Sequence, residues 1–199
     1  MSEINWHDLF YVNPLTGEAS ESQFDGFIFA SPTYGVYGGA FNPDPSVTLL
    51  TDNNQPYSYQ ELLDVAPKKL DPVDFSDYLY YVHDVQSQNA LTTDEQIAAD
   101  INLITALAAR VPENDPTFDP EESFYAGLVI TAISAKVIIE GGFVDPSLLI
   151  EAGSDIQYGL ENFTKQELKS VSKVLGDIFA FDASLTHSQP HGHDDLLLA

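Results

Sequence analysis

This sequence of 199 residues contains no cysteine and only seven lysine and arginine residues. The absence of cysteine excludes disulfide bonds, thiol catalysis and thiolate-bound metal ions. The seven basic residues stand against 31 acidic ones, which gives a formal net charge of −24. Nucleic-acid binding depends on clustered lysine and arginine, so we expect no nucleic-acid partner. The same acidity would repel anionic membrane surfaces unless a cation lies between them.

Several catalytic and targeting motifs are also missing. The sequence has no phosphate-binding GxxxxGK[ST] loop, no nucleophile elbow and no HExxH pair. The N-terminal segment MSEINWHDLF has neither a basic start nor an uninterrupted apolar core, so it does not predict a secretory signal. The functional interpretation therefore depends on polar residues within amphipathic segments.

Residues 72–84, PVDFSDYLYYVHD, predict a helix that Asp74 or Ser76 could cap. His83 and Asp84 flank its apolar stripe and point in different directions, because consecutive helical residues diverge by about 100°. This arrangement suits one residue as a base and the other as a metal ligand, although such a pair is also common at a solvated helix boundary. The predicted apolar stripe consists of Phe75, Tyr78, Leu79, Val82 and Val85.

A second helix is predicted over residues 93–110, with Thr92 or Thr93 as its cap. Asp100 falls on its apolar face, where a carboxylate without a partner is costly to bury. The short loop from Ser87 to Leu91 favours an antiparallel helix pair, in which His83 could be that partner. The pairing would fix the tautomer of His83 and stabilise its protonated form. Alternatively, Asp100 lies at the rim of the helix pair. The apolar neighbours expected for Asp100 are Ile97, Leu103, Ile104 and Leu107.

Residues 34–42, YGVYGGAFN, are rich in glycine. Glycine tolerates positive φ, which lets main-chain carbonyls turn toward a ligand. Calcium and other hard cations accept such carbonyl oxygens. The same pattern also occurs in ordinary turns.

Taken in this order, the three segments resemble the phospholipase A2 superfamily, the secreted calcium-dependent type and its viral, bacterial and fungal relatives. The family pattern is Tyr-Gly-x-Tyr-x-Gly, then Pro-x-Asp-x-x-Asp, then His-Asp, then a later aspartate. The matching residues here are Tyr34, Gly35, Tyr37 and Gly39, then Pro72, Asp74 and Asp77, then His83 and Asp84, then Asp100. The resemblance implies a mostly α fold with a core of two antiparallel helices and additional C-terminal helices.

The resemblance also implies an activity, namely calcium-dependent hydrolysis of the sn-2 ester of glycerophospholipids during transient contact with a membrane surface. In that role His83 would activate water and Asp100 would orient His83. Calcium would be held by Asp84 and by loop carbonyls near Tyr37, Gly39 and Phe41. The alternatives are a non-catalytic lipid- or partner-binding protein on the same scaffold, or a secreted acidic helical effector.

The sequence departs from the family pattern at several positions. Leu79 and Tyr80 stand in place of a cysteine pair, and Phe41 stands in place of a glycine. Ser87 replaces a tyrosine that supports the catalytic aspartate, so this support is either missing or supplied by another residue such as Tyr78 or Tyr81.

We predict four regions along the chain. They are an N-terminal segment (1–23), the phospholipase A2-like core (24–110), a helical extension (111–183) and a flexible tail (184–199). The core carries an insertion at 43–71, which is either a lid or decoration. Within the extension, residues 123–140 predict a buried core helix, with a membrane-inserting segment as the alternative. A brief helical turn at 146–151 and an amphipathic helix at 165–181 complete it.

The tail, SLTHSQPHGHDDLLLA, differs in composition from the rest of the chain. Its three histidines could bind zinc or nickel, although an exposed flexible tail is the simpler expectation. Its acidic residues followed by LLLA resemble the C-terminal signals of bacterial type I export. That resemblance implies secretion, and a cytoplasmic location is the alternative.

Overall fold

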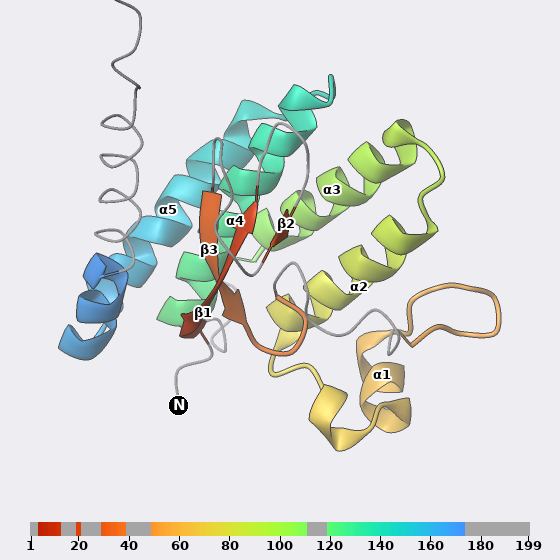
Figure 1. Cartoon of the computed structure of the whole chain (residues 1–199), viewed down its shortest axis with the longest axis horizontal. Helices are drawn as coiled ribbons and strands as arrows, with labels where there is room; N and C mark the ends of the chain where they lie inside the picture. The colour runs from red at the N-terminus through yellow and green to blue at the C-terminus, as the bar shows by residue number, and fades with distance from the viewer. Residues whose placement is uncertain (1–3, 13–18, 21–28, 39–48, 111–118, 174–199) are drawn as a thin grey trace, which may run out of the picture. The chain divides into compact units, whose positions relative to one another are not determined.

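The computed structural model describes residues 4–12, 19–20, 29–38, 49–110 and 119–173. The chain divides into two compact units, residues 1–163 and 164–199. In the second unit, residues 165–173 are helical. The remainder of the helix predicted to residue 181, together with the C-terminal tail, lies outside the described residues. The first unit is mostly α-helical, as predicted (Figure 1).

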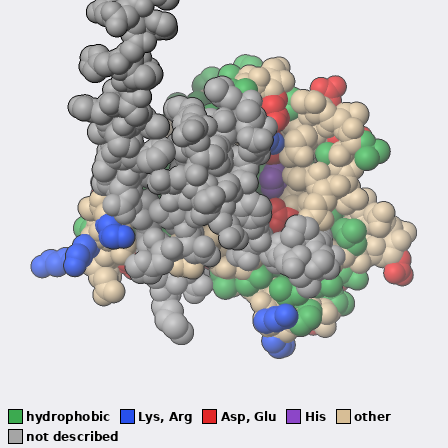
Figure 2. Space-filling view, viewed as in Figure 1, with side chains coloured by type: hydrophobic (Ala, Val, Ile, Leu, Met, Phe, Trp, Pro, Cys, Tyr) green, Lys and Arg blue, Asp and Glu red, His purple; other side chains and the backbone are tan. Residues whose placement is uncertain are grey.

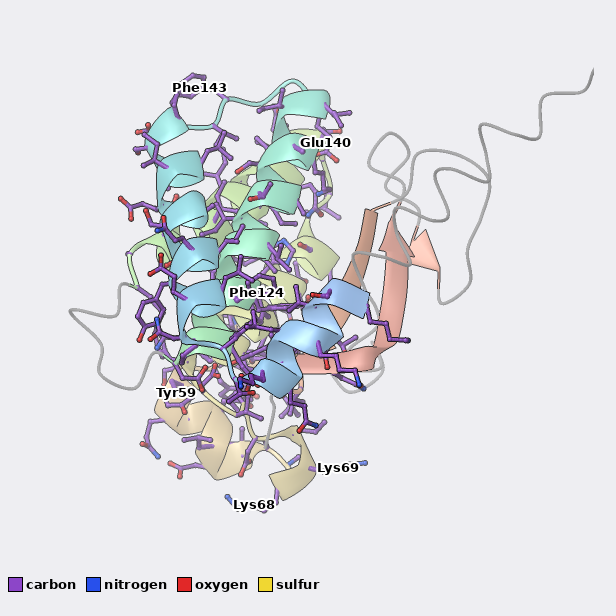
Figure 3. All side chains as sticks on the ribbon, turned by 90° about the vertical axis from the view of Figure 1, so that its left-hand side faces the viewer. Tyr59, Lys68, Lys69, Phe124, Glu140 and Phe143 are labelled. Carbon is purple, nitrogen blue, oxygen red and sulfur yellow. The ribbon has the colours of Figure 1, made fainter. Side chains whose placement is uncertain are left out.

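A small antiparallel sheet begins the first unit and was not predicted as a sheet. Its strands are β1 (Ile4–Val12), β2 (Ala19–Ser20) and β3 (Phe29–Tyr34), in the order β2-β1-β3. The register of β1 against β3 shifts between Asn5 and Leu9. Such an irregularity disrupts the alternation of apolar and polar residues by which strands are recognised. The sheet lies to one side of the helices, and Ile4 of β1 is buried (Figures 1 and 3).

The two long helices of the predicted core begin at the expected caps, and the short helix before them begins at a cap for which no residue was predicted. Helix α1 (Tyr59–Val65) starts with a capping box made by Ser58 and Glu61, and a short 3₁₀ turn, η2 (Lys68–Leu70), follows. Helix α2 (Phe75–Asn89) is capped by Asp74. Helix α3 (Thr93–Ala108) is capped by Thr92 in a second capping box. In each case a side-chain oxygen accepts a hydrogen bond from a backbone amide that the first helical turn leaves unpaired.

The predicted apolar stripe of α2 is correct only at Val85, since its other four members are not buried. The buried face carries Tyr80, Tyr81 and Val85 together with the polar residues Ser76 and Asp77, whereas Phe75 is 41% exposed. Hydrophobic periodicity missed this face because two of its members are polar residues that find buried partners. For α3 the expected face is correct, since Asp100, Leu103, Ile104 and Leu107 are all buried.

Helices α4 (Pro120–Ile139) and α5 (Pro146–Asn162) pack against each other, and both begin with proline in the first turn. The sequence predicted only a short turn at 146–151, so α5 is much longer than expected. Its glycines look like helix breakers, but Gly159 faces the Phe124 side chain and the Pro120 carbonyl of α4. A side chain there would collide with α4, so Gly159 permits close helix packing. Figure 3 shows Phe124 at this contact.

Helix α4 also bears on the membrane alternative. By length and composition it could cross a membrane, and 50% of the tested segment is buried inside the structure. It packs against both α3 and α5, and Lys136 within it forms an ion pair with Asp100. These contacts favour the predicted buried core helix.

A buried ion pair joins three helices where α2 begins and α3 ends. Arg110 pairs with Glu122 of α4 and donates to Ser76 Oγ of α2 at 2.5 Å. The backbone N–H of Ser76 donates to Glu122 Oε1 at 3.2 Å. Buried charges require such partners, so this cluster helps to fix how α2, α3 and α4 meet.

Candidate active site

Helices α2 and α3 bring His83 and Asp100 together. Three contacts between the helices join His83 to Asp100, Ser87 to Gln96 and Ser76 to the end of α3 at Arg110. Residue numbers rise along α2 as they fall along α3, which makes the pair antiparallel. His83 Nε2 lies 2.7 Å from Asp100 Oδ1.

Asp100 is fully buried and has polar partners on both carboxylate oxygens. Its Oδ1 faces His83 and also accepts a hydrogen bond from Gln96 Nε2 at 3.3 Å. Its Oδ2 forms an ion pair with Lys136 of α4. Burial alone would raise the pKa of Asp100, but the hydrogen bonds and charges of His83 and Lys136 together lower it. Asp100 is therefore held in its ionised form.

The tyrosine support expected for Asp100 is absent among the residues described here. Tyr78 Oη donates to the Tyr57 carbonyl at 3.0 Å, and Tyr81 Oη donates to the Leu49 carbonyl at 2.6 Å. Both hydroxyls therefore bond to other partners, so neither Tyr78 nor Tyr81 replaces the tyrosine that is missing at position 87. Ser87 Oγ lies 3.2 Å from His83 Nε2 and accepts from Gln96 at 2.9 Å. The charged group that supports the Asp100 carboxylate is the ammonium group of Lys136.

The second ring nitrogen of His83 faces Asp84. The distance from His83 Nδ1 to Asp84 Oδ1 is 3.8 Å, which is too long for a hydrogen bond and is a separation that one water molecule can bridge. Burial lowers the pKa of His83, but the hydrogen bond to Asp100 and the negative charges of Asp100 and Asp84 together raise it above its ordinary value. Burial raises the pKa of Asp84 to about 6 against the opposing effect of His83.

The site is open to solvent on one side. The side chain of His83 is 17% exposed and that of Asp84 is 27% exposed, whereas Asp100 is inaccessible. The space-filling view shows a histidine at the surface, between acidic side chains and beside a basic one (Figure 2). The imidazole of His83 is thus partly accessible to solvent, while its Nε2 is bonded to the inaccessible Asp100.

Asp77 fastens the glycine-containing turn, residues 34–38, to α2. It is fully buried, and its carboxylate accepts backbone N–H groups from Val36 at 2.9 Å, Tyr37 at 2.7 Å and Val73 at 3.0 Å. Burial raises the pKa of Asp77 to about 7, although the three amide donors act in the opposite direction. Gly35 has a φ of +58°, and a Cβ atom there would lie 2.5 Å from Asp77 Cγ. Only glycine fits between the turn and this carboxylate.

Two tyrosines of the turn are fixed by the same part of α2. Tyr34 Oη donates to Asp74, and its ring stacks on Tyr125 with 5.0 Å between centroids. Tyr37 Oη donates to the Leu70 carbonyl at 2.7 Å. Burial, with smaller contributions from nearby groups that include the Asp84 carboxylate, raises the pKa of Tyr37. The turn is thus anchored near the helix segment that carries Asp84.

The calcium ligands expected from the sequence are described only in part. Asp84 and Tyr37 are described, whereas Gly39 and Phe41 lie outside the described residues. Among the described side chains, no group of three His, Asp or Glu residues could hold a metal ion. The expected site needs one carboxylate and several main-chain carbonyls, an oxygen set that calcium accepts. Asp84 is partly exposed and lies on the helix to which the turn is anchored, so it could supply the carboxylate of such a set.

No protein-family model, curated protein or solved structure matches this chain. The site is therefore interpreted from its own geometry.

Sequence reasoning missed Lys136, Gln96 and the roles of two aspartates of the core motif. Lys136 is the only charged residue between Ser123 and Ile139, so its isolation in an apolar helix was the available signal. Gln96 precedes Asp100 by four residues, a spacing that places both on one side of a helix. Asp74 and Asp77 were named only as part of the family pattern. In the structure Asp74 accepts hydrogen bonds from Tyr34 Oη and from the Asp77 backbone at the start of α2, and Asp77 accepts one from the Val36 backbone in the turn.

Proposed function

We propose that this protein is a calcium-dependent phospholipase A2 that hydrolyses the sn-2 ester of glycerophospholipids at a membrane surface. The observation that carries the proposal is the 2.7 Å contact between His83 Nε2 and Asp100, with His83 Nδ1 turned toward Asp84 at 3.8 Å. A second support is the clamp by which Asp77 fastens the glycine-containing turn to the same helix. These two features, the paired histidine and aspartate and the fastened turn, are what support the proposal.

In this reaction His83 acts as the general base through Nδ1, because Nε2 is already bonded to Asp100. Water loses a proton to Nδ1 as its oxygen attacks the ester carbonyl. Asp100 keeps the ring in the required tautomer and stabilises the imidazolium that forms. The protonated His83 then donates its proton to the leaving glycerol oxygen as the ester bond breaks. The products are a fatty acid and a lysophospholipid, and no acyl-enzyme is formed.

Calcium would be held by Asp84 and by main-chain carbonyls at Tyr37, Gly39 and Phe41. When bound, it would polarise the ester carbonyl and stabilise the negative charge that develops on its oxygen. Secretion is part of the same proposal, because extracellular fluids supply calcium at the level such a site requires. The C-terminal segment proposed as an export signal lies outside the described residues.

The test is fatty-acid release from zwitterionic phosphatidylcholine vesicles, with millimolar calcium and with a chelator. We compare the wild type with His83→Gln, Asp84→Asn and Asp64→Asn. Asp64 is an exposed carboxylate of α1 and serves as the matched control for Asp84. We expect calcium-dependent release by the wild type and by Asp64→Asn, and a loss of at least about 100-fold in the other two variants. Circular dichroism and the melting temperature verify that each variant is folded.

Two results would contradict the proposal. Release that persists in His83→Gln would remove His83 as the base. An inactive wild type that still binds vesicles or calcium would instead favour the non-catalytic alternative on the same scaffold.

A further inference from the structure

Lys136 occupies a position that helix packing alone does not explain. It is the single charged residue between Ser123 and Ile139 of the apolar helix α4. Its side chain is 25% exposed, and its ammonium group reaches inward to the fully buried Asp100. A buried ion pair often contributes no more stability than apolar residues of similar size. A purely structural helix pair could therefore carry apolar residues at both 136 and 100, so the retention of both charges calls for a further reason.

Lys136 and His83 bind opposite oxygens of the same carboxylate. His83 Nε2 faces Oδ1 at 2.7 Å, whereas Lys136 Nζ is bonded to Oδ2. A carboxylate held at both oxygens cannot rotate about its terminal bond, so Oδ1 remains directed at the imidazole. Gln96 adds a weaker third contact at 3.3 Å. The orientation of the Asp100 carboxylate toward His83 thus depends mainly on Lys136, which lies on a third helix, α4.

We propose that Lys136 is a positioning residue, which fixes and keeps ionised the carboxylate that orients His83. This inference rests on the proposed function, in which His83 is the base. In the family pattern a tyrosine supports this aspartate, and a tyrosine hydroxyl would donate a hydrogen bond without adding a charge. Lysine supplies a full positive charge, which favours an ionised carboxylate in a site that solvent does not reach. The other charged groups facing this site are Asp84 of α2 and Glu140 at the end of α4, with Glu140 Oε1 3.6 Å from Lys136 Nζ.

A double-mutant cycle tests whether Lys136 acts through Asp100. The variants are Lys136→Met and Lys136→Arg, each in the wild type and in Asp100→Asn, assayed on phosphatidylcholine vesicles with calcium. Lys69→Met is the matched control, because Lys69 projects into solvent from η2 (Figure 3). We expect Lys136→Met to lower kcat by about 10- to 100-fold with KM changed less than about threefold, and Lys136→Arg to restore most of the rate. In the Asp100→Asn background, Lys136→Met should change kcat by less than about threefold. An equal loss of kcat in both backgrounds would overturn the proposal.

A second measurement does not depend on activity. The ¹⁵N chemical shifts of the His83 ring, at a fixed pH where the ring is neutral, report which nitrogen carries the proton. We expect the Nε2–H tautomer in the wild type and in Lys69→Met, and a mixture of tautomers in Lys136→Met. A ring spectrum that Lys136→Met leaves unchanged would overturn the positioning role. If the wild type hydrolyses no phospholipid but the tautomer depends on Lys136, the proposed function fails and the positioning of His83 by this ion pair stands.

Lys136→Met could also prevent folding, because it leaves Asp100 without its cationic partner. The double variant with Asp100→Asn carries no buried charge here and is expected to fold. If Lys136→Met does not fold, the kinetic and NMR comparisons use Lys136→Arg against Lys136→Gln. If Asp100→Asn folds alone but the double variant does not, Lys136 acts independently of Asp100, which contradicts the proposal.

Discussion

Asp155 should make the stability of this protein depend on pH. It lies on α5, is 4% exposed, and accepts a hydrogen bond from Ser123 Oγ at 3.2 Å. Its Oδ2 has no hydrogen-bond partner among the described residues. Burial therefore raises its pKa to about 7 from an ordinary 3.8, against the hydrogen bond from Ser123 and with a contribution from Glu151.

The sign of the effect follows from proton binding. Between pH 4 and 7 the folded protein retains a proton on Asp155 that the unfolded chain has lost. The stabilisation is complete below pH 4 and disappears as the pH rises through 7. A difference of about 3 pKa units corresponds to about 4 kcal/mol, and we take roughly 2–4 kcal/mol because buried sites respond as if partly solvated. Asp155→Asn resembles the protonated carboxyl group and should avoid this penalty.

The assay is urea unfolding followed by circular dichroism at pH 4.5 and pH 8. We expect Asp155→Asn to be more stable than the wild type by roughly 2–4 kcal/mol at pH 8, and by no more than about 1 kcal/mol at pH 4.5. Glu151→Gln, one turn earlier on α5, is the control for removing an acidic residue and should change stability by less than about 1 kcal/mol. A difference between Asp155→Asn and the wild type that is the same at both pH values would refute the titration of Asp155.

Two glycine substitutions test the packing that positions the site, each by denaturant unfolding. Gly35→Ala should lose about 2–4 kcal/mol, because it adds backbone strain and a collision with the Asp77 carboxylate. Gly141→Ala also has positive φ but no atom within 4 Å, so it should lose only about 1–2 kcal/mol, and equal losses would argue against the collision. Gly159→Ala should lose about 1–3 kcal/mol by separating α4 from α5. Gly153→Ala, in open space on the same helix, should gain about 0.5–1 kcal/mol, and a gain at 159 as well would contradict the close packing.

The sequence predicted the helices of the core well because their ends are encoded locally. Asp74 and Thr92 cap α2 and α3 through side-chain oxygens that act within one turn. The apolar face of α3 was also predictable, since its pattern is regular. The resemblance named His83 and Asp100 together, and their contact needs only a short loop between two antiparallel helices.

What could not be predicted depends on residues distant in sequence. Lys136 looked like an interruption of an apolar helix, because its partner lies on another helix. Ser76 was predicted only as a possible cap and Asp77 only as part of the family pattern, yet both are buried against partners that periodicity cannot reveal. The helix at 146–162 was predicted only to residue 151, because the close approach of α4 that accommodates Gly159 exists only in the folded protein. In each case a local rule was overruled by a contact made in three dimensions.

These distant contacts also account for how a chain without disulfides holds this site. Tyr80 stands where the family pattern has one cysteine of a pair, and its ring packs edge-on against Tyr34 and Tyr125. Aromatic packing thus joins α2 to the turn and to α4. Asp77 and the Asp100–Lys136 pair then add contacts that only one arrangement of these elements can satisfy. Because a buried polar group is costly without its partner, a shift of any element by one turn would leave at least one carboxylate unpaired. The charged groups of the core therefore select the geometry of the site, while the apolar and aromatic contacts supply most of the cohesion.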